Sequence, residues 1–183
     1  MCEVAQRFAG WLDLGSNVAA ALEFVFARWD GRGFPDARGD EIPAIVDCYR
    51  FFAGAVRTQH GMVAGEYLEG FTSMIRRDPI GVVASIAPWN YPLMMMAWKL
   101  APAIAGGNTV VFKPSEQTPF TALKMAKILA EELPEGVVNV ITGRGHSVGN
   151  YLINHPQVDM ISITGDVATG KKIAEHQHPT AVI

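Results

Sequence analysis

The stretch IGVVASIAPWNYPLMMMAWKLAPAIAGGNTVVFKPS, residues 80–115, decides the fold class. Its first ten residues contain a β-branched run that predicts a buried strand. Residues 92–107, PLMMMAWKLAPAIAGG, predict a helix, and TVVFKPS at residues 109–115 predicts a second strand. A strand, a helix and a second apolar strand in this order predict one unit of a parallel α/β sheet.

The same alternation continues to the end of the chain. A helix is expected over residues 118–133, with Thr118 as its N-cap and Pro119 at the first helical position. A third strand is expected at 136–143, a short helix at 146–155, a fourth strand at 159–165 and a helix opening at Val167. Because the strands are continuously apolar, the pattern predicts a doubly wound, mostly parallel, Rossmann-like α/β sheet.

The N-terminal part predicts helices and a hairpin. Residues 17–29 are expected to form a helix, residues 30–40 a loop rich in Gly and Asp, and residues 41–60 a second helix with one apolar stripe. Cys48 lies in that second helix, where packing is the expected role. Residues 66–78 predict a β-hairpin that turns at Gly70.

Composition excludes several classes of function. The 183 residues are 49% hydrophobic and 18% charged, with a net charge of −3, which gives no footprint for nucleic acid or an anionic membrane. Lys99 and two prolines interrupt the longest apolar stretch, so no bilayer span is expected. Only Cys2 and Cys48 occur, and the histidines form no metal-binding pattern. We therefore expect a cytoplasmic chain without a metal site.

Polar residues follow each expected strand, in the segments PWN, KPSE, TGRG and TGD. Parallel strands bring these ends to one edge of the sheet, where Asn90, Lys113 and Glu116 would suit a dinucleotide. Each residue also has a plainer interpretation: Asn90 caps a turn, Lys113 is solvated, and Glu116 supports a helix N-terminus. Residues 143–149, GRGHSVG, have glycine spacing that suggests a phosphate loop, but they follow the third strand, so a turn and close helix packing explain them equally well.

The segments PWN, WKLAPA.A.GN, KPSE.TP.TA and P.GVVN...G, in that order, resemble the NAD-binding region of the aldehyde dehydrogenase superfamily. The resemblance covers about residues 39–170. Within the family, the residues of this segment are most similar to those of the aminobutyraldehyde and betaine-aldehyde dehydrogenase branch. It implies an incomplete aldehyde dehydrogenase fold. Residues 1–64 would be a helical part of the cofactor domain, 65–79 an oligomerisation hairpin, and 80–183 a truncated NAD-binding domain.

The resemblance also implies roles for single residues. Asn90 would donate to the aldehyde oxygen as an oxyanion-hole amide, and Glu116 would hold the adenosine ribose and disfavour a cofactor with a 2′-phosphate. The residues that would contact NAD are Pro88, Trp89, Lys113, Ser115, Glu116, Gly145, Gly149, Gly165 and Asp166. The implied partners are a small aldehyde, NAD and further copies of the chain.

Two departures from the family pattern set the functional expectation. The family has Thr-Gly-Ser where this chain has Asp166, and a carboxylate about 4 Å from pyrophosphate costs about 4 kcal/mol at an effective dielectric constant of about 20, before relaxation and screening. Asp166 is alternatively a helix N-cap, and we favour the cap with weakened NAD binding as its consequence.

The second departure is the absence of the family's nucleophilic Cys motif and its Glu-Leu-Gly-Gly-Lys motif, since the chain stops before the strand that carries the latter. We therefore expect a fragment that is inactive alone. The alternatives are a nucleotide-binding module and an oligomer-interaction module, both without catalysis, and a non-functional product that folds poorly because apolar surface is exposed.

Overall fold

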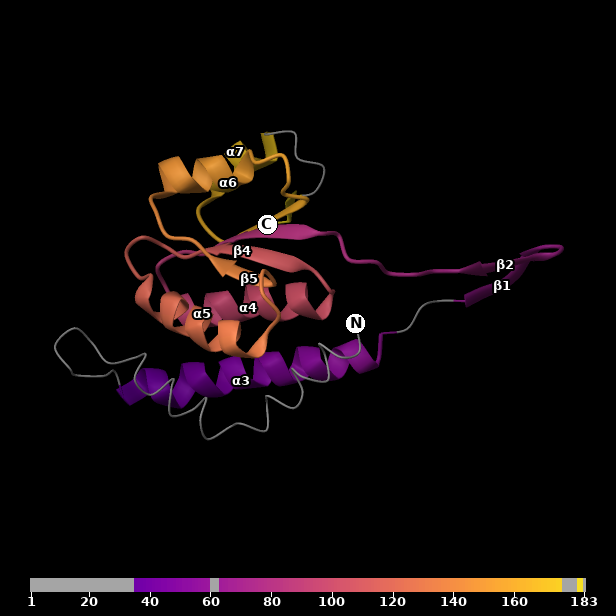
Figure 1. The fold of residues 1–183 in the computed structure, drawn as a ribbon, viewed down its shortest axis with the longest axis horizontal. Coiled ribbons are helices and arrows are strands. Elements are labelled where there is room, and N and C mark those ends of the chain that lie inside the picture. Colours follow the sequence, from indigo (N-terminus) through magenta and orange to yellow (C-terminus); the bar gives the residue numbers. More distant parts are fainter. Residues whose placement is uncertain (1–34, 60–62, 176–180, 183) are drawn as a thin grey trace.

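The computed structural model describes residues 35–59, 63–175 and 181–182 (Figure 1). The described elements are α3 (Pro35–Arg57), β1 (Val63–Leu68), β2 (Phe71–Met74), β3 (Val82–Ile86), α4 (Pro92–Ala105), β4 (Thr109–Lys113), α5 (Phe120–Glu132), β5 (Val138–Val140), the π-helical turn η2 (Gly145–Gly149), α6 (Asn150–Ile153), β6 (Met160–Ile163), α7 (Val167–Glu175) and β7 (Ala181–Val182). Among these described helices, none is long and apolar enough to cross a bilayer.

Within the described residues, five parallel strands form one sheet in the order β5-β4-β3-β6-β7. The first strand of this sheet in the sequence is β3, at its centre. The next two strands, β4 and β5, lie on one side of β3, and β6 then pairs with β3 on its other side. This reversal between β3 and β6 creates the switch point at which doubly wound sheets bind ligands. The predicted doubly wound, parallel α/β fold is confirmed.

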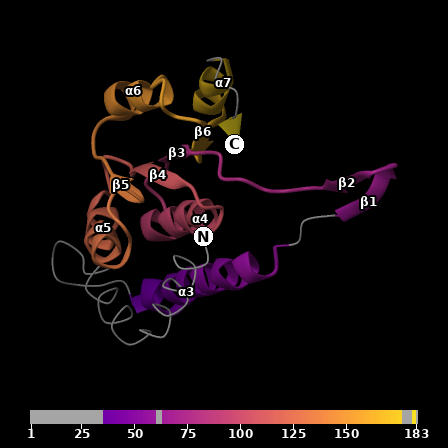
Figure 2. The same cartoon turned by 45° about the vertical axis from the view of Figure 1, so that its right-hand side comes forward.

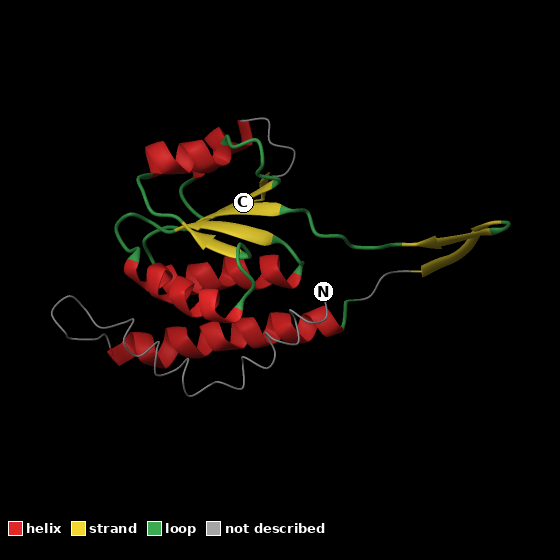
Figure 3. Cartoon of the chain, viewed as in Figure 1, coloured by secondary structure: helices red, strands yellow, loops and turns green. Residues whose placement is uncertain are grey.

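Helices cover both faces of this sheet (Figure 3). α4 and α5 lie on one face with α3 packed outside them, while α6 and α7 cover the opposite face (Figures 1 and 2). Two hydrophobic cores result. Phe112, Met96 and Leu129 belong to the core under α4 and α5, and Ala84 and Ile161 belong to the core under α6 and α7. Burial on both faces explains why the strands are continuously apolar.

Several boundaries differ from those expected. α3 begins at Pro35, so residues 35–40 are helical and not a loop; proline fits the first helical turn, and the buried Ile45 and Tyr49 hold the helix against the core. α5 begins at Phe120 and its N-cap is Pro119, whose side chain cannot accept a hydrogen bond, so Thr118 is not the cap. The Thr118 hydroxyl donates to Trp89 O at 3.2 Å. The helix expected over residues 17–29 lies outside the described residues.

The chain also reaches one strand more than expected. The sequence predicted four parallel strands, and the structure adds a fifth, β7, in which Ala181 and Val182 pair with Ile161 and Ser162. Two residues give too short a pattern for periodicity to detect.

The predicted hairpin is confirmed and projects away from the sheet (Figures 1 and 2). β1 and β2 pair in antiparallel fashion and turn at Gly70, whose φ of 79° lies in the left-handed region. The Gly70 N–H donates to Glu66 Oε1 at 3.0 Å, which closes the turn. Leu68, Phe71 and Met74 are exposed, so the described part of the chain leaves most of the surface of these three side chains uncovered.

Two side chains fix the beginning of β3. Asn108 Oδ1 accepts the N–H groups of Ile80 at 2.7 Å and Gly81 at 3.1 Å, and Asp159 Oδ2 accepts the N–H of Val82 at 2.8 Å. Gly81 has a φ of 123°, and a Cβ there would overlap the Asp159 carboxylate. The central strand is therefore aligned by polar side chains from the loops before β4 and before β6.

A buried lysine lies between α4 and the sheet. Lys99 Nζ donates to Ser162 Oγ on β6 at 3.1 Å, and burial lowers the pKa of Lys99 to about 8. Ser85, which pairs with Ser162 on the neighbouring strand, is fully buried, and its Oγ has no hydrogen-bond partner within the described part of the chain. Lys99 is therefore a buried cation between α4 and the sheet, and the strand next to its partner Ser162 holds a buried hydroxyl without a hydrogen bond.

The Gly81→Ala substitution is expected to destabilise the fold by about 2–4 kcal/mol, because it adds left-handed backbone strain to a steric overlap. Gly54 in α3 is a matched control, since a Cβ there has no neighbour within 4 Å. Gly54→Ala should stabilise the helix by about 0.5–1 kcal/mol. Urea unfolding measures the stability of both variants. A Gly81→Ala variant as stable as the native chain would contradict the close approach of Asp159 to the start of β3.

The buried Lys99 is expected to make stability depend on pH. Its folded pKa of about 8 lies below the ordinary 10.5, so the unfolded chain binds more protons between these values. Lys99 therefore lowers stability below pH 8, and this penalty disappears as the pH rises from 8 to 10.5. Lys99→Met should add about 1–3 kcal/mol at pH 7 and progressively less above pH 8. If the difference in the free energy of unfolding between the native chain and Lys99→Met stays constant from pH 7 to pH 10, the pKa of Lys99 is not lowered by burial.

Candidate functional site

The loop after β3 carries the first group of candidate residues. The Ala87 N–H donates to Lys113 O at 3.1 Å and extends the pairing of β3 with β4. Beyond it, Pro88 is half-buried, whereas Trp89 and Asn90 are exposed at the edge of the sheet. Because Thr118 binds Trp89 O, the loops after β3 and β4 are tied together.

Tyr91 connects this loop to α4 in a strained conformation. Its φ of 48° and ψ of 50° place it in the left-handed region, and it is the one described non-glycine residue there. Its carbonyl accepts the Met95 N–H at 2.8 Å, so the strained residue starts the helix. Strain of this kind persists where surrounding structure enforces it, often at functional sites. Here it leaves Asn90 at the N-terminus of α4.

The loop after β4 holds a fixed cation beside a carboxylate. Lys113 is only 2% exposed, and its Nζ donates to Pro114 O at 3.1 Å and lies 3.6 Å from Glu116 Oε2. The pKa of the Glu116 carboxyl is lowered by its own backbone N–H, by the charge of Lys113 and by the N–H of Gly145. The interpretation of Lys113 as a solvated side chain is therefore wrong.

The turn after β5 completes this group. The carbonyl of Arg144 accepts the N–H groups of Ser147, Val148 and Gly149 and winds the π-helical turn η2. A Cβ at Gly149 would lie 3.7 Å from Cδ and Cε of Lys113, which is ordinary contact. The structure thus brings Lys113, Glu116, Gly145 and Gly149 together from two loops.

Ser115 lies half-buried beside this group, and its Oγ accepts the N–H of Gln117 at 3.2 Å. Its hydroxyl therefore serves the loop after β4 and leaves its proton to donate elsewhere.

The loop after β6 answers the question raised by Asp166. Asp166 Oδ1 accepts the N–H of Thr169 at 2.9 Å, and Oδ2 accepts its hydroxyl at 2.6 Å. These two bonds, the hydroxyl first, lower the pKa of the Asp166 carboxyl. The N-cap interpretation is confirmed, and an N–H at the start of α7 that suits a phosphate is taken by a side chain.

These loops all lie at the carboxyl edge of the parallel sheet. Asn90 and the exposed Gly165 and Asp166 follow β3 and β6 at the switch point, while the Lys113 group lies beyond β4 and β5. The arrangement offers hydroxyl-binding groups at one end and backbone amides at the other, which suits an elongated dinucleotide. In the described ranges, no three His, Cys, Asp or Glu side chains are placed to hold a metal ion.

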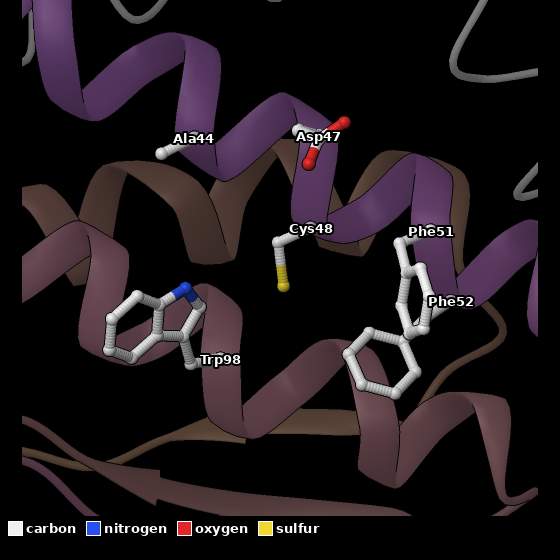
Figure 4. Close-up of a pocket in the computed structure, with 6 residues that line it drawn as sticks. All are labelled: Ala44, Asp47, Cys48, Phe51, Phe52 and Trp98. Atoms are coloured by element: carbon white, nitrogen blue, oxygen red, sulfur yellow. The ribbon is translucent and has the colours of Figure 1, made fainter.

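A groove between α3 and α4 was not anticipated from the sequence (Figure 4). It has a volume of about 510 Å³ and is lined by Ala44, Asp47, Cys48, Phe51, Phe52 and Trp98. The Cys48 thiol contacts Ala97 O at 3.9 Å, and burial, with a smaller effect from Asp47, raises its pKa. Helical spacing predicts which face of α3 is apolar, but it gives no sign that Trp98 lies opposite.

Comparison with known proteins agrees with this architecture. Residues 11–182 match the aldehyde dehydrogenase family. The fluoroacetaldehyde dehydrogenase of Streptantibioticus cattleyicolor is 41% identical over 149 residues, covering 81% of this chain and 29% of that protein. The long-chain-aldehyde dehydrogenase of an Acinetobacter species is 39% identical, covering 90% of this chain and 33% of the relative.

Solved structures give the same result. The NAD⁺ complex of an aldehyde dehydrogenase from Bacillus cereus superimposes with a TM-score of 0.86 at 36% identity, covering 95% of this chain and 35% of that one. The NAD⁺ complex of betaine aldehyde dehydrogenase from Staphylococcus aureus gives 0.80 at 32% identity, covering 95% and 34%. The chain spans about a third of the length of the curated relatives it matches. Its sequence and its fold together place it in the aldehyde dehydrogenase family.

Proposed function

We propose that this chain provides the cofactor-binding part of an NAD-dependent enzyme that oxidises an aldehyde to a carboxylic acid. The observation that carries the proposal is the convergence of four polar loops, after β3, β4, β5 and β6, at the carboxyl edge of the sheet, on both sides of the β3–β6 switch point. Bound NAD would supply the hydride acceptor, and the NAD⁺ complexes of the solved relatives support this choice of cofactor.

The residues fit one half of the cofactor better than the other. The Glu116 carboxylate, held by Lys113 and Gly145, suits the hydroxyls of the adenosine ribose and opposes a 2′-phosphate through charge repulsion. Gly145 and Gly149 would lie against the adenine half, with Ser115 beside them. At the other end, Pro88 and Trp89 would border the nicotinamide.

The pyrophosphate half fits poorly because of Asp166. Its carboxylate accepts the hydrogen bond of the Thr169 N–H and places a negative charge in the turn after Gly165. A phosphate there would meet like-charge repulsion and lose a backbone donor. We propose that Asp166 weakens NAD binding relative to a chain with an uncharged cap.

Asn90 would stabilise the aldehyde oxygen. Its side-chain amide is exposed at the N-terminus of α4, where a donor would meet negative charge as it develops on that oxygen. A nucleophilic thiolate is a separate requirement of this chemistry. Cys48, with its raised pKa and its contact to Ala97 O, does not supply one. We propose that the 183 residues bind NAD but do not oxidise an aldehyde.

For the whole enzyme we propose an aldehyde that carries an amino or quaternary ammonium group. The resemblance of residues 39–170 to the aminobutyraldehyde and betaine-aldehyde branch supports this choice, and the similarity in fold to betaine aldehyde dehydrogenase agrees with it.

The domain division follows from the same assignment. Residues 1–64 would belong to the cofactor domain as its helical part, 65–79 would be the oligomerisation element, and 80–183 would form the NAD-binding domain. The exposure of Phe71 and Met74 on the projecting hairpin supports an interface there, since apolar side chains this exposed gain most from burial against another chain.

Replacing Asp166 by Ser is expected to tighten NAD binding by about tenfold or more, because the repulsion is removed while serine still caps α7. Isothermal titration calorimetry measures the affinity for NAD of the native chain, of Asp166→Ser and of the charge-matched control Glu131→Gln on α5. NADH absorbance after addition of 4-aminobutyraldehyde should not rise in any of the three. Equal affinities of the native chain and Asp166→Ser would contradict the role of Asp166, and NADH formation would overturn the proposed inactivity.

Replacing Phe71 by Ser on the hairpin should lower self-association without unfolding the sheet, because Phe71 is 64% exposed and packs little of its surface on the body. Sedimentation velocity over a range of concentrations measures the effect. Tyr151→Ser, at an exposed aromatic on α6, is the control. If the native chain is monomeric throughout, residues 65–79 do not form an oligomerisation element in this chain.

A further inference from the structure

The Asn90 amide lies on a loop that side-chain packing alone does not hold. The side chains of Trp89, Asn90 and Tyr91 are all exposed on the described part of the chain, with Trp89 62% and Tyr91 53% exposed. Among the same described residues, the Asn90 side chain has no hydrogen-bond or ion-pair partner. The position of this amide therefore depends on how the backbone is held at its two neighbours.

Both neighbours of Asn90 are anchored. Tyr91 is held in the left-handed region with a φ of 48°, and its carbonyl accepts the Met95 N–H at 2.8 Å. On the other side, the carbonyl of Trp89 accepts the Thr118 hydroxyl at 3.2 Å. Beyond the pairing of the two strands, this is the one hydrogen bond that the described residues make between the loop after β3 and the loop after β4. Loss of the Thr118 hydroxyl would release the loop on one side while the start of α4 stays in place.

Thr118 belongs to the turn that carries Glu116. Its N–H donates to Ser115 O at 3.2 Å, and Ser115 Oγ accepts the Gln117 N–H at 3.2 Å, so residues 115–118 form one closed turn. Glu116 lies inside this turn, with its Oε2 3.6 Å from Lys113 Nζ. A ligand held by Glu116 would therefore contact the same turn that anchors the loop after β3.

The hydroxyl does not have the local role that is common for threonine at the start of a helix. Threonine is favoured as an N-cap, but the N-cap of α5 is Pro119, and no side chain caps this helix. The Thr118 hydroxyl has a single proton, and it donates this proton to a carbonyl 29 positions earlier in the sequence. It therefore serves the contact between two loops and not the helix that follows it.

We propose that Thr118 is a positioning residue: its hydroxyl fixes the Trp89 carbonyl, and thereby Asn90, and couples that amide to the turn around Glu116. The inference rests on the proposed function, in which Asn90 would donate to the aldehyde oxygen and Glu116 would bind the ribose. Binding of the ribose at one end of the site is then transmitted to the amide at the other end. Such positioning matters because a displacement of about 1 Å can lower a reaction rate about a hundredfold.

The test uses the 183-residue chain labelled with ¹⁵N. Thr118→Val replaces the hydroxyl by a methyl group, and Thr118→Ser keeps the hydroxyl. Without ligand, the backbone order parameters of Trp89 and Asn90 should be about 0.85 in the native chain and below about 0.6 in Thr118→Val. The order parameters of Glu116 and Gly145 should not change, and Thr118→Ser should keep the native values throughout.

Titration with adenosine measures the coupling between the two ends of the site. This nucleoside has the ribose but no phosphate, so the Asp166 carboxylate does not oppose its binding. Adenosine should shift the amide signals of Glu116 and Gly145 in the native chain and in both variants. It should shift the amide signal of Asn90 only where residue 118 carries a hydroxyl, in the native chain and in Thr118→Ser.

Thr58→Val is the matched control, because the Thr58 hydroxyl also donates to a carbonyl, that of Ala55, at 3.2 Å. Asn90 should behave in this control as in the native chain. Two results would overturn the proposal: equal order parameters of Trp89 and Asn90 in the native chain and Thr118→Val, or a shift of Asn90 with adenosine that persists in Thr118→Val. If adenosine shifts no signal of the native chain, the nucleotide site and the coupling to it are overturned, and the order parameters alone decide whether Thr118 positions Asn90.

Discussion

The alignment of β3 between β4 and β6 is the constraint on which the rest of the structure depends. Asn108 and Asp159 hold the N–H groups of residues 80–82 and fix where the central strand begins. Since β3 pairs in register with both neighbours, its start also determines where all three strands end. The candidate residues are thus positioned by hydrogen bonds at the opposite edge of the sheet.

The consequence for chemistry is that the two ends of the candidate site differ. The Lys113–Glu116 pair and Gly145 form a fixed polar group that suits ribose hydroxyls, whereas the start of α7 is capped by Asp166. Both features are local hydrogen-bonded arrangements at loop ends, yet under the proposed function they would have opposite effects on the binding of a dinucleotide. Under the proposed function, this one acidic residue would lower the affinity for NAD without changing the fold that presents the site.

The sequence predicted most of the fold because the strands are buried on both faces and carry a strong apolar signal. It failed where the signal was short or polar. The Gly and Asp residues before residue 41 suggested a loop, although packing of Ile45 and Tyr49 extends α3 back to Pro35. The two-residue strand β7 was too short to detect.

The candidate site was predictable only in part. The polar strand ends of a parallel sheet must meet at one edge, so the convergence of the candidate loops followed from fold class alone. Whether Asp166 capped a helix or repelled a ligand depended on the position of Thr169, which the sequence left open. The groove could not be predicted, because it forms between Cys48 and Trp98 on helices that meet only after folding.

The central claim is that the loops after β3, β4, β5 and β6 form one nucleotide site, and mapping amide chemical shifts during titration with millimolar NAD tests it most directly. The account predicts shifts in Trp89 and Asn90, in Ser115 and Glu116, in Gly145 to Gly149 and in Gly165 to Thr169, with the hairpin unchanged. Shifts confined to other regions, or to one of these loops alone, would contradict it.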